Sequence, residues 1–494
     1  MRYTVLLLLF FCLFVSSQAQ NNAVDSLLNA GSLKTGSYSI YAIDASTGQT
    51  IYSSPQKSLS TASVMKLFTT TVALEVLGPE HTFSTSLYYT GNLNAKTGVL
   101  KGNLILKGGA DPAFYSSYFE DHYRGCFENW VNLLKMSGIR KIDGKILLDL
   151  SALDRTSVPG GWNWDDIGNY YGAGVSALTF MDNTYSIHFS SPETAGKLVT
   201  VKSIQPEIPG LKLENLVRSS LISGDHTIVY GAPGSYQEYV EGTIPVSRAD
   251  FVVRASMPDP AMVAGQTLLK KIREGGISIS GGVAKMATKD TTKRILVSNF
   301  QSPSLKDLIV PLNKESLNLF AEHLLCEIGR VQADASNLAP ANGSGVLHEG
   351  ESALASGLEA YSKFCKDKGI YSEGFFPADG SGLSRGNALT ARTLVETMKS
   401  VYDGPNRELF FNAFPVAGVD GTLKNSFKGT PLEKNLKAKT GSMARVRSIA
   451  GMMQTKNGKT VLVAIILNNF DLPSSGTSKL LESILMTVYN EQGN

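Results

Sequence analysis

A predicted β-hairpin near the start of the chain constrains the fold most, because no partner strand follows it closely. Residues 37–43 and 49–52 read as its two strands, on either side of a turn rich in Ser, Thr and Gly. Partner strands are predicted near the other end, at residues 447–454 and 459–468, which flank a Lys-Asn-Gly turn. We therefore predict an α/β (α+β) domain whose sheet combines both ends of the chain.

Between these ends, residues 83–289 have a different sequence pattern, in which short strand-like runs alternate with Gly, Pro, Asn and Asp. Such runs, separated by turn residues, are typical of strand-rich domains. We predict that this region is inserted into a discontinuous domain of residues 20–82 and 290–494. The insertion is expected to hold two nested domains, with the inner one at about residues 98–178.

The first residues have the pattern of a secretory signal peptide, which we place at residues 1–19. Arg2 precedes an apolar block at residues 4–15, and the small residues Ser17 and Ala19 follow it. The alternative is a membrane anchor, but this block is shorter than the roughly 20 apolar residues that span a bilayer. We therefore expect a periplasmic or secreted protein with no transmembrane segment in the mature chain.

Composition argues against several kinds of partner and cofactor. The formal charge of +3 is small for a nucleic-acid-binding surface, and the six histidines lack the spacing of metal ligands. Of the four cysteines, Cys12 lies in the signal peptide, and none belongs to a Cys-x-x-Cys motif. We predict no nucleic-acid partner, no metal and no organic cofactor, and leave one Cys326–Cys365 bridge as an open alternative.

Residues 61–68 join a polar turn to an apolar run, and they predict the start of a buried helix. Apolar residues recur at helical spacing as far as Gly78-Pro79, which is a stop signal. Ser63 should lie in the first turn with Lys66 on the same face, because positions three apart are neighbours on a helix. Burial lowers the pKa of a lysine, so Lys66 could take the Ser63 proton. The alternative is a capped helix with a solvated lysine, since Ser-x-x-Lys alone is a common pattern.

A second stretch with compatible chemistry contains Ser316 and Asn318, in an apolar and helical context. The hydroxyl could relay a proton, and the amide could bind a substrate carbonyl and hold Lys66 in place. A helix cap is the alternative interpretation of these two residues.

A third stretch, Lys439-Thr440-Gly441-Ser442, precedes a strand-like run. On a strand, Lys439 and Gly441 would point one way, and Thr440 and Ser442 the other. Gly441 would keep the wall thin beside an extended substrate. The other three side chains could hold a carboxylate by charge and hydroxyl hydrogen bonds, although a simple β-turn is the alternative.

In this order, Ser-x-x-Lys, Ser-x-Asn and Lys-Thr-Gly form the motif set of serine β-lactamases and penicillin-binding proteins. The chain resembles the class C low-molecular-mass penicillin-binding proteins, which are D-alanyl-D-alanine carboxypeptidases and endopeptidases. The long insertion between Lys66 and Ser316 indicates this subgroup. Supporting stretches are Lys107-Gly108-Gly109-Ala110-Asp111-Pro112, Gly161-Trp162-Asn163-Trp164-Asp165-Asp166 and Asp379-Gly380-Ser381-Gly382-Leu383-Ser384-Arg385.

The resemblance implies a transpeptidase/β-lactamase-like domain, in which helices flank an antiparallel sheet and strand-rich domains are inserted. It implies Ser63 as the acylated nucleophile and Lys66 as its base. Ser316 would relay the proton, and Asn318 would orient it.

The resemblance also implies a binding site for the substrate's terminal carboxylate, made by Lys439, Thr440 and Ser442. The backbone N–H groups of Ser63 and Ser442 would form the oxyanion hole, and a backbone N–H beside Gly441 helps to complete it.

Relatives that act on meso-diaminopimelate peptides hold the free end of that side chain with an acid and an arginine. Asp166 and Arg385 match these positions, and Tyr171 would supply an aromatic wall. Ala444 stands where relatives can carry a polar side chain, so that contact is missing here. For Asp166, an N-cap or surface acid is the alternative interpretation.

The predicted reaction is release of D-alanine from peptidoglycan stem peptides and muropeptides, and possible cleavage of cross-bridges as an endopeptidase. β-Lactam antibiotics should acylate Ser63, because their lactam and carboxylate mimic the dipeptide end. The alternatives are a β-lactamase or esterase of the same fold, and a non-catalytic wall-binding or β-lactam-sensing module.

Overall fold

The computed structural model describes residues 24–28, 33, 35–154, 157–287, 292–336 and 352–491, so the predicted signal peptide lies outside the described residues. The chain divides into two compact units. The first unit comprises residues 1–79, 309–317 and 358–494, and the second unit comprises residues 80–308 and 318–357.

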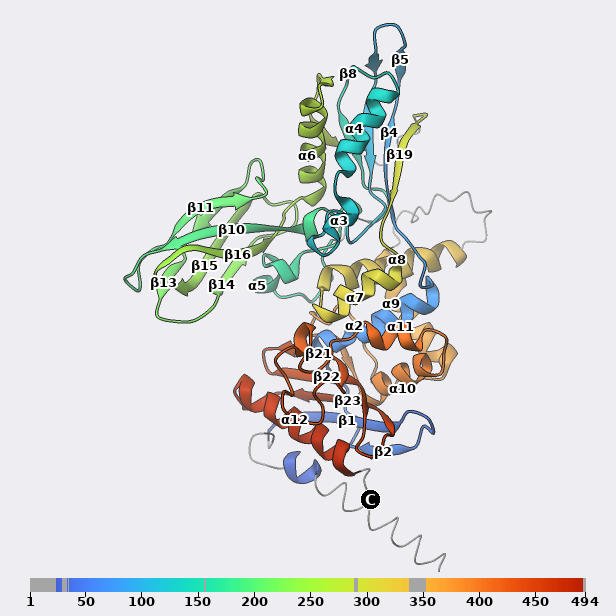
Figure 1. Cartoon of the computed structure of the whole chain (residues 1–494), viewed down its shortest axis with the longest axis vertical. Coiled ribbons are helices and arrows are strands. Elements are labelled where there is room, and N and C mark those ends of the chain that lie inside the picture. The colour runs from blue at the N-terminus through green and yellow to red at the C-terminus, as the bar shows by residue number, and fades with distance from the viewer. Residues whose placement is uncertain are drawn as a thin grey trace, which may run out of the picture. The chain divides into compact units, whose positions relative to one another are not determined.

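A five-stranded antiparallel sheet forms the centre of the first unit, in the order β2-β1-β23-β22-β21 (Figure 1). Its strands are β1 (Ser37–Asp44), β2 (Thr50–Ser53), β21 (Lys437–Met443), β22 (Val446–Gln454) and β23 (Thr460–Asn468). Strand β1 pairs with β23 along its whole length, from Ser37 opposite Asn468 to Asp44 opposite Val461. The prediction that the end of the chain supplies the partner of the opening hairpin is therefore confirmed.

Helices cover both faces of this sheet. Helix α12 (Ser474–Glu491) packs its apolar stripe against Val461, Val463 and Ile465 of β23, in one core cluster. Ala464 of β23, whose side chain points to the opposite face, is also fully buried. On that face α10 (Ala391–Tyr402) contacts β23 and β1, and α2 (Met65–Val76) contacts α10. Side chains alternate between the two faces of a strand, so this arrangement accounts for the unbroken apolar run of β23. An antiparallel sheet flanked by helices is the predicted fold class, and it is confirmed.

Shorter elements complete the first unit. They are β3 (Leu59–Ser60), which pairs with β20 (Ala388–Leu389), the 3-10 turns η2 (Ala62–Val64) and η6 (Gly421–Leu423), helix α11 (Arg407–Asn412), and parts of α7 (Leu305–Lys314) and α9 (Ala353–Lys368).

The second unit contains two sheets built from strands that lie far apart in the sequence. Their orders are β18-β9-β7-β4-β19 and β17-β8-β6-β5. The strands are β4 (Ser84–Tyr89), β5 (Asn92–Asn94), β6 (Val99–Lys101), β7 (Leu104–Lys107), β8 (Lys141–Asp143), β9 (Ile146–Asp149), β17 (Ser278–Ile279), β18 (Val283–Lys285) and β19 (Ile295–Gln301). Helices α4 (Cys126–Met136) and α6 (Pro260–Glu274) pack against each other beside these strands (Figure 1). The other helical segments of this unit are α3 (Glu120–Tyr123), α5 (Trp164–Ile167), α8 (Asn318–Ser336), and the 3-10 turns η3 (Ser117–Phe119), η4 (Tyr170–Gly172) and η5 (Met181–Asn183).

The strands of a third group in the second unit, over residues 184–256, pair with one another. Ala255 of this group also forms an isolated β-bridge with Asn169. The group consists of the sheet β11-β10-β16 and of β12, β13 and β14, which all pair with β15. The strands are β10 (Thr184–Ser191), β11 (Thr200–Gln205), β12 (Lys212–Asn215), β13 (Arg218–Ser220), β14 (His226–Tyr230), β15 (Gln237–Pro245) and β16 (Arg248–Ser256).

These pairings differ from the predicted domain boundaries in two respects. The group of strands that pair with one another spans residues 184–256 rather than about 98–178. Within 98–178, β6, β7, β8 and β9 pair with β5, β4, β17 and β18, respectively, which all lie outside that range. The insertion also extends past residue 289, because β19 pairs with β4 and α8 belongs to the second unit. Strand pairing across a long sequence separation has no local signal, which is why the sequence pattern does not show these pairings.

Within the described ranges, none of the helices is both long and apolar enough to cross a bilayer.

Candidate active site

Ser63 and Lys66 lie in direct contact at the start of the buried helix α2. Ser63 occupies the 3-10 turn η2, which continues into α2 at Met65. Lys66 is fully buried, and its Nζ donates to Ser63 Oγ at 3.0 Å and to the carbonyl oxygen of Ser381 at 2.7 Å. A hydroxyl and an amine at this distance can exchange a proton, as a nucleophile and its base must.

The turn that carries Ser63 is packed tightly against the edge strand β21. Ala62 has a φ of 47°, a left-handed conformation that is uncommon for residues other than glycine and is often found at functional sites. Ser448, on β22, donates from Oγ to the Thr61 carbonyl at 2.6 Å. A Cβ atom added to Gly441 would lie 2.3 Å from Ser448 Oγ and 2.9 Å from Ser63 N. Glycine is therefore required here by the approach of the Ser63 backbone, and not only by the substrate as the sequence suggested.

Lys439 and Ser316 form a second hydroxyl–amine pair. Lys439 Nζ donates to Ser316 Oγ at 2.9 Å and to the Thr440 carbonyl at 2.9 Å. Burial, and secondly the positive charge of Lys66, hold the pKa of Lys439 well below its usual range. Lys439 is therefore suited to give and take a proton near Ser316.

Ser316 does not lie in a helix, contrary to the helical pattern that we predicted around it. Helix α7 ends at Lys314 and α8 begins at Asn318, and Ser316 between them has a φ of 62°. Apolar spacing continues across this break, so periodicity alone could not locate it.

The loop of residues 379–387 positions Lys66, a role that the sequence did not reveal. The fully buried Asp379 carboxylate accepts from Gly382 N and Ser384 N, both at 2.6 Å, and from Asn387 Nδ2 at 2.7 Å. These bonds hold the loop so that Ser381 presents its carbonyl to Lys66. The density of Asp, Ser, Gly and Asn in this stretch is the one signal that could have indicated a tight side-chain-stabilised turn.

The predicted carboxylate-binding side chains lie along the edge strand β21. Thr440 Oγ1 donates to Thr422 Oγ1 at 2.7 Å, and Ser442 is exposed. Arg447, which sequence reasoning missed, donates from Nη1 to Ser442 Oγ at 2.5 Å. Arg385 is exposed and donates to the Ala444 carbonyl at 3.3 Å, so it lies beside the turn that follows Ser442.

The remaining predicted residues, Asp166, Tyr171 and Asn318, lie together in the second unit. Asn318 Nδ2 donates to the Tyr171 carbonyl at 2.7 Å. Burial, and then the neighbouring Asp166 carboxylate, raise the pKa of the Tyr171 hydroxyl. Asn163 Nδ2 donates to Asp166 Oδ2 at 3.1 Å, which orients the carboxylate.

Asn169 attaches this segment to the strands of residues 184–256. Its side chain is nearly fully buried; Nδ2 donates to the Asp165 carbonyl at 2.7 Å, and Oδ1 accepts from Val229 N at 3.1 Å. The adjacent Gly168 is equally constrained, since a Cβ atom there would lie 2.1 Å from the Val229 carbonyl oxygen. The inserted strands thus hold the backbone that carries Asp166 and Tyr171.

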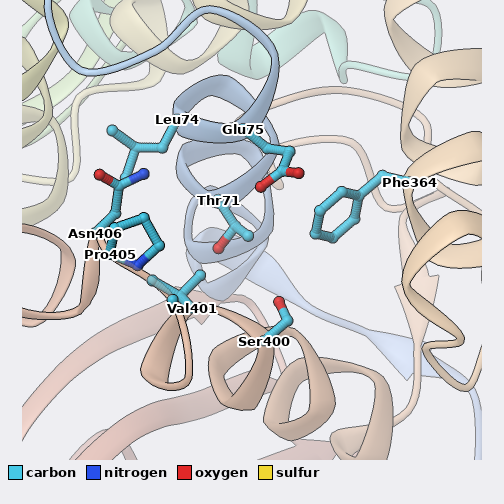
Figure 2. Close-up of a pocket in the computed structure, with 9 residues that line it drawn as sticks. Thr71, Leu74, Glu75, Phe364, Ser400, Val401, Pro405 and Asn406 are labelled. Carbon is cyan, nitrogen blue, oxygen red and sulfur yellow. The ribbon is translucent and has the colours of Figure 1, made fainter.

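A separate pocket lies beside the middle of α2 (Figure 2). It is lined by Thr71, Leu74, Glu75, Phe364, Ser400, Val401, Gly404, Pro405 and Asn406. Glu75 pairs with Lys368 at 2.5 Å, and Thr71 Oγ1 donates to the Leu67 carbonyl at 3.0 Å. Two of its polar side chains are thus bonded within the helix and to a neighbouring residue.

In the part of the chain that the structure describes, no group of three or more His, Cys, Asp or Glu side chains could hold a metal ion. Cys126, Cys326 and Cys365 are buried free thiols, so the conceivable Cys326–Cys365 bridge is not formed. Burial raises the pKa of Cys126 and of Cys365 to about 12, which makes both unreactive as thiolates near neutral pH.

Comparison with known proteins places this chain in a family. The profile of the "D-Ala-D-Ala carboxypeptidase 3 (S13) family" matches residues 20–480. The chain is 27% identical to a D-alanyl-D-alanine carboxypeptidase of Actinomadura sp. (strain R39), over 90% of this chain and 80% of that protein. It is 26% identical to the D-alanyl-D-alanine carboxypeptidase DacB of Haemophilus influenzae, over 87% and 85% of the two chains.

The fold agrees with this similarity. The crystal structure of penicillin-binding protein 4 (DacB) from Haemophilus influenzae matches 94% of this chain and 99% of its own, with a TM-score of 0.77 at 23% identity. That protein has also been solved in complex with a β-lactam. Because the family profile covers almost the whole length, the chain belongs to the D-Ala-D-Ala carboxypeptidase 3 (S13) family of serine peptidases.

Proposed function

We propose that this D-Ala-D-Ala carboxypeptidase acts on peptidoglycan stem peptides through an acyl-enzyme formed on Ser63. The observation that carries the proposal is the 3.0 Å contact between Lys66 Nζ and Ser63 Oγ at the start of a buried helix. Removal from water strengthens such a contact, because no solvent competes for the hydroxyl proton.

In the acylation step, Lys66 takes the hydroxyl proton while Ser63 Oγ bonds to the carbonyl carbon of the penultimate D-alanine. The carbonyl oxygen then carries the negative charge. The N–H groups of Ser63 and Ser442 are proposed to stabilise it, and the close approach of Gly441 to Ser63 N supports this assignment.

The tetrahedral intermediate collapses when the C–N bond breaks and the terminal D-alanine leaves as an amine. We propose that the leaving nitrogen receives its proton from Ser316, which is replenished by Lys439 at 2.9 Å. Asn318 is proposed to orient this exchange. The proton that Lys66 took is passed on to Lys439, so both amines regain their starting states. Water then attacks the ester carbonyl carbon and gives one proton to Lys66, which passes it to Ser63 Oγ as the ester C–O bond breaks. The shortened peptide leaves as a carboxylic acid, and Ser63 is restored.

Substrate recognition is proposed to involve two sets of side chains. Lys439, Thr440 and Ser442 would bind the terminal carboxylate. Asp166 and Arg385 would hold the free end of a diaminopimelate side chain, with Tyr171 as its wall; the grouping of Asp166 with Tyr171 supports this.

β-Lactams are proposed to acylate Ser63, as suggested by the family and by the β-lactam complex of the Haemophilus protein. Residues 1–19 are proposed to direct export, so that the enzyme meets its substrate in the periplasm or outside the cell.

The test is covalent labelling with a fluorescent penicillin, followed by mass analysis of digested muropeptides. The wild type should be labelled at Ser63 and should release one alanine per pentapeptide. Ser63→Ala should show neither property, whereas the control Ser53→Ala, on the exposed end of β2, should show both. Equal labelling of Ser63→Ala and the wild type would contradict the proposal, and splitting of dimers would identify an endopeptidase.

A further inference from the structure

The proposed carboxylate site raises a question of charge, because its lysine is turned away from the surface. Lys439 is fully buried, and its Nζ is bonded to Ser316 Oγ and to the Thr440 carbonyl. Its pKa is also held well below the usual range, by burial and by Lys66. Lys439 is thus engaged with Ser316, and a second positive charge for the substrate carboxylate would have to come from another residue.

Arg447 supplies a cation beside the exposed end of the same strand. It lies on β22 directly opposite Ser442 on β21, and its Nη1 donates to Ser442 Oγ at 2.5 Å. A guanidinium keeps its charge throughout the pH range in which enzymes work, whereas a buried amine does not. Hydrogen bonds from charged donors are in general shorter and stronger than those between neutral groups.

The contact also determines what the Ser442 hydroxyl can do. A serine hydroxyl has one hydrogen, and its oxygen accepts through lone pairs. Because Arg447 donates to the oxygen, the hydrogen of Ser442 has to point to a different acceptor. Ser442 is exposed, so a carboxylate lying along the edge strand can be that acceptor.

The Thr440 hydroxyl, on the same strand, differs from that of Ser442 in its partner. It donates to Thr422 Oγ1, a neutral group, at 2.7 Å. Of these two hydroxyls, Ser442 is the one polarised by a cation. The substrate's carboxylate would therefore bind mainly at the Ser442 end of β21.

We infer that Arg447 is a specificity-determining positioning residue, which orients and polarises Ser442 toward the C-terminal carboxylate of the substrate. The enzyme then selects peptides that end in a free D-alanine acid over those whose end is amidated. This inference rests on the proposed function, and it adds a residue that lies outside the three motifs.

The test compares a tripeptide ending in D-Ala-D-Ala with the same peptide as its C-terminal amide, by measuring release of D-alanine or D-alaninamide. Arg447→Met should lower kcat/KM for the acid by about 10- to 100-fold, mostly through KM, and should change it less than about 2-fold for the amide. Arg447→Lys should restore part of the loss. The control Lys437→Met removes a charge from β21, the strand that carries Ser442, where Lys437 Nζ bonds to Asn412 Oδ1. It should leave kcat/KM unchanged for both the acid and the amide.

A purely structural role for Arg447 predicts equal losses for acid and amide, and that result would overturn the inference. An Arg447→Met enzyme with wild-type kcat/KM for the acid would also overturn the inference. Ser442→Ala should cause a similar loss, and the double variant should be no worse than either single one, because both act on one interaction. If the wild type released no D-alanine and bound no penicillin, the proposed function itself would fail, which is a distinct outcome.

Acylation by a penicillin and by its methyl ester provides a second measurement that does not depend on peptide turnover. Arg447→Met should slow acylation by the acid and leave that by the ester unchanged. Equal rates for the acid in the variant and the wild type would contradict the inference.

Discussion

The two units of this enzyme hold their predicted site residues in different ways. In the first unit, Lys66 and Lys439 are fully buried, and their amines donate to neighbouring oxygen atoms at distances from 2.7 Å to 3.0 Å. In the second unit, Asp166 and Tyr171 are half-buried on a short segment, which the Asn169 side chain ties to neighbouring strands.

This difference follows from the chemistry that each unit would perform. Proton transfer depends steeply on distance and on the exclusion of water, so its groups need rigid surroundings. Recognition of a peptide side chain needs complementary charge at a site that the substrate can reach, so its groups remain partly exposed. Changes in the first unit should therefore affect kcat most, and changes in the second unit should affect KM.

The largest effect is expected from Lys66→Met, which removes the proposed base. The rate of D-alanine release at saturation should fall by about 10³-fold, a typical contribution of a general base. Lys66→Arg should not restore it, because a guanidinium does not give up its proton in a protein. The surface variant Lys368→Met is the charge control. If the Lys66→Arg enzyme kept more than about a tenth of the wild-type rate, Lys66 would act only through its charge.

A smaller effect is expected from Gly441→Ala, which leaves all the chemical groups in place. The added Cβ would lie 2.3 Å from Ser448 Oγ and 2.9 Å from Ser63 N, so the Ser63 turn has to move. A displacement near 1 Å can cost about 10²-fold, and we expect acylation by penicillin to slow to that extent.

The matched control for Gly441 is Gly404→Ala in the same unit, where the nearest atom would be 3.4 Å away. Gly404→Ala should acylate at the wild-type rate. If both alanine variants did so, the tight fit of β21 against Ser63 would have no functional importance.

A several-fold effect on KM alone is expected from Asn169→Ala in the second unit. Loss of its two hydrogen bonds should loosen the segment with Asp166 and Tyr171 and raise KM for diaminopimelate stem peptides about 3- to 10-fold, with kcat retained.

Asn215→Ala is a close control for Asn169, because its amide makes the same kind of bonds, to the Val199 carbonyl at 2.7 Å and from Val217 N at 3.1 Å. The segment that Asn215 holds in place contains no predicted site residue. An equal rise in KM in both variants would indicate general loosening, and a fall in kcat for Asn169→Ala would remove the proposed contrast between the units.

The smallest effect on activity is expected from Asp111→Asn, which should instead change the pH dependence of stability. Burial raises the pKa of Asp111 from 3.8 to about 7, although bonds from Ala113 N and Tyr123 partly offset this. Between these pH values the folded state holds a proton that the unfolded state has lost, so stability falls as pH rises from about 4 to about 7.

Thermal unfolding of the two proteins across this pH range provides the measurement. The difference between their midpoints should shift by a few °C or more in favour of the Asp111→Asn variant as pH rises, because the amide has no charge to bury. A constant difference would show that Asp111 titrates normally.

The contact between Ser63 and Lys66 was predictable because it depends on local spacing. Three positions separate Ser63 and Lys66 on a helix, and that alone brings a hydroxyl and an amine together. The closing hairpin and the partner strand of the opening hairpin were also predictable, since alternation and a Lys-Asn-Gly turn are strong local signals.

Other features were missed because they depend on contacts between distant segments. The helical spacing around Ser316 conceals a break with a positive φ. The pairing of β19 with β4 moved a domain boundary, and no pattern within residues 295–301 specifies that partner. The loop that holds Lys66 gave only a composition signal.

The amino-acid sequence by itself determined which groups are proposed to do the chemistry and that the two ends of the chain share a sheet, because helical spacing and strand alternation are properties of neighbouring residues. Only the tertiary structure decided that Gly441 must lack a side chain beside Ser63, and that Arg447 meets Ser442. Those contacts depend on the register of β21 against β22 and on how a turn packs against them, which a linear pattern does not contain.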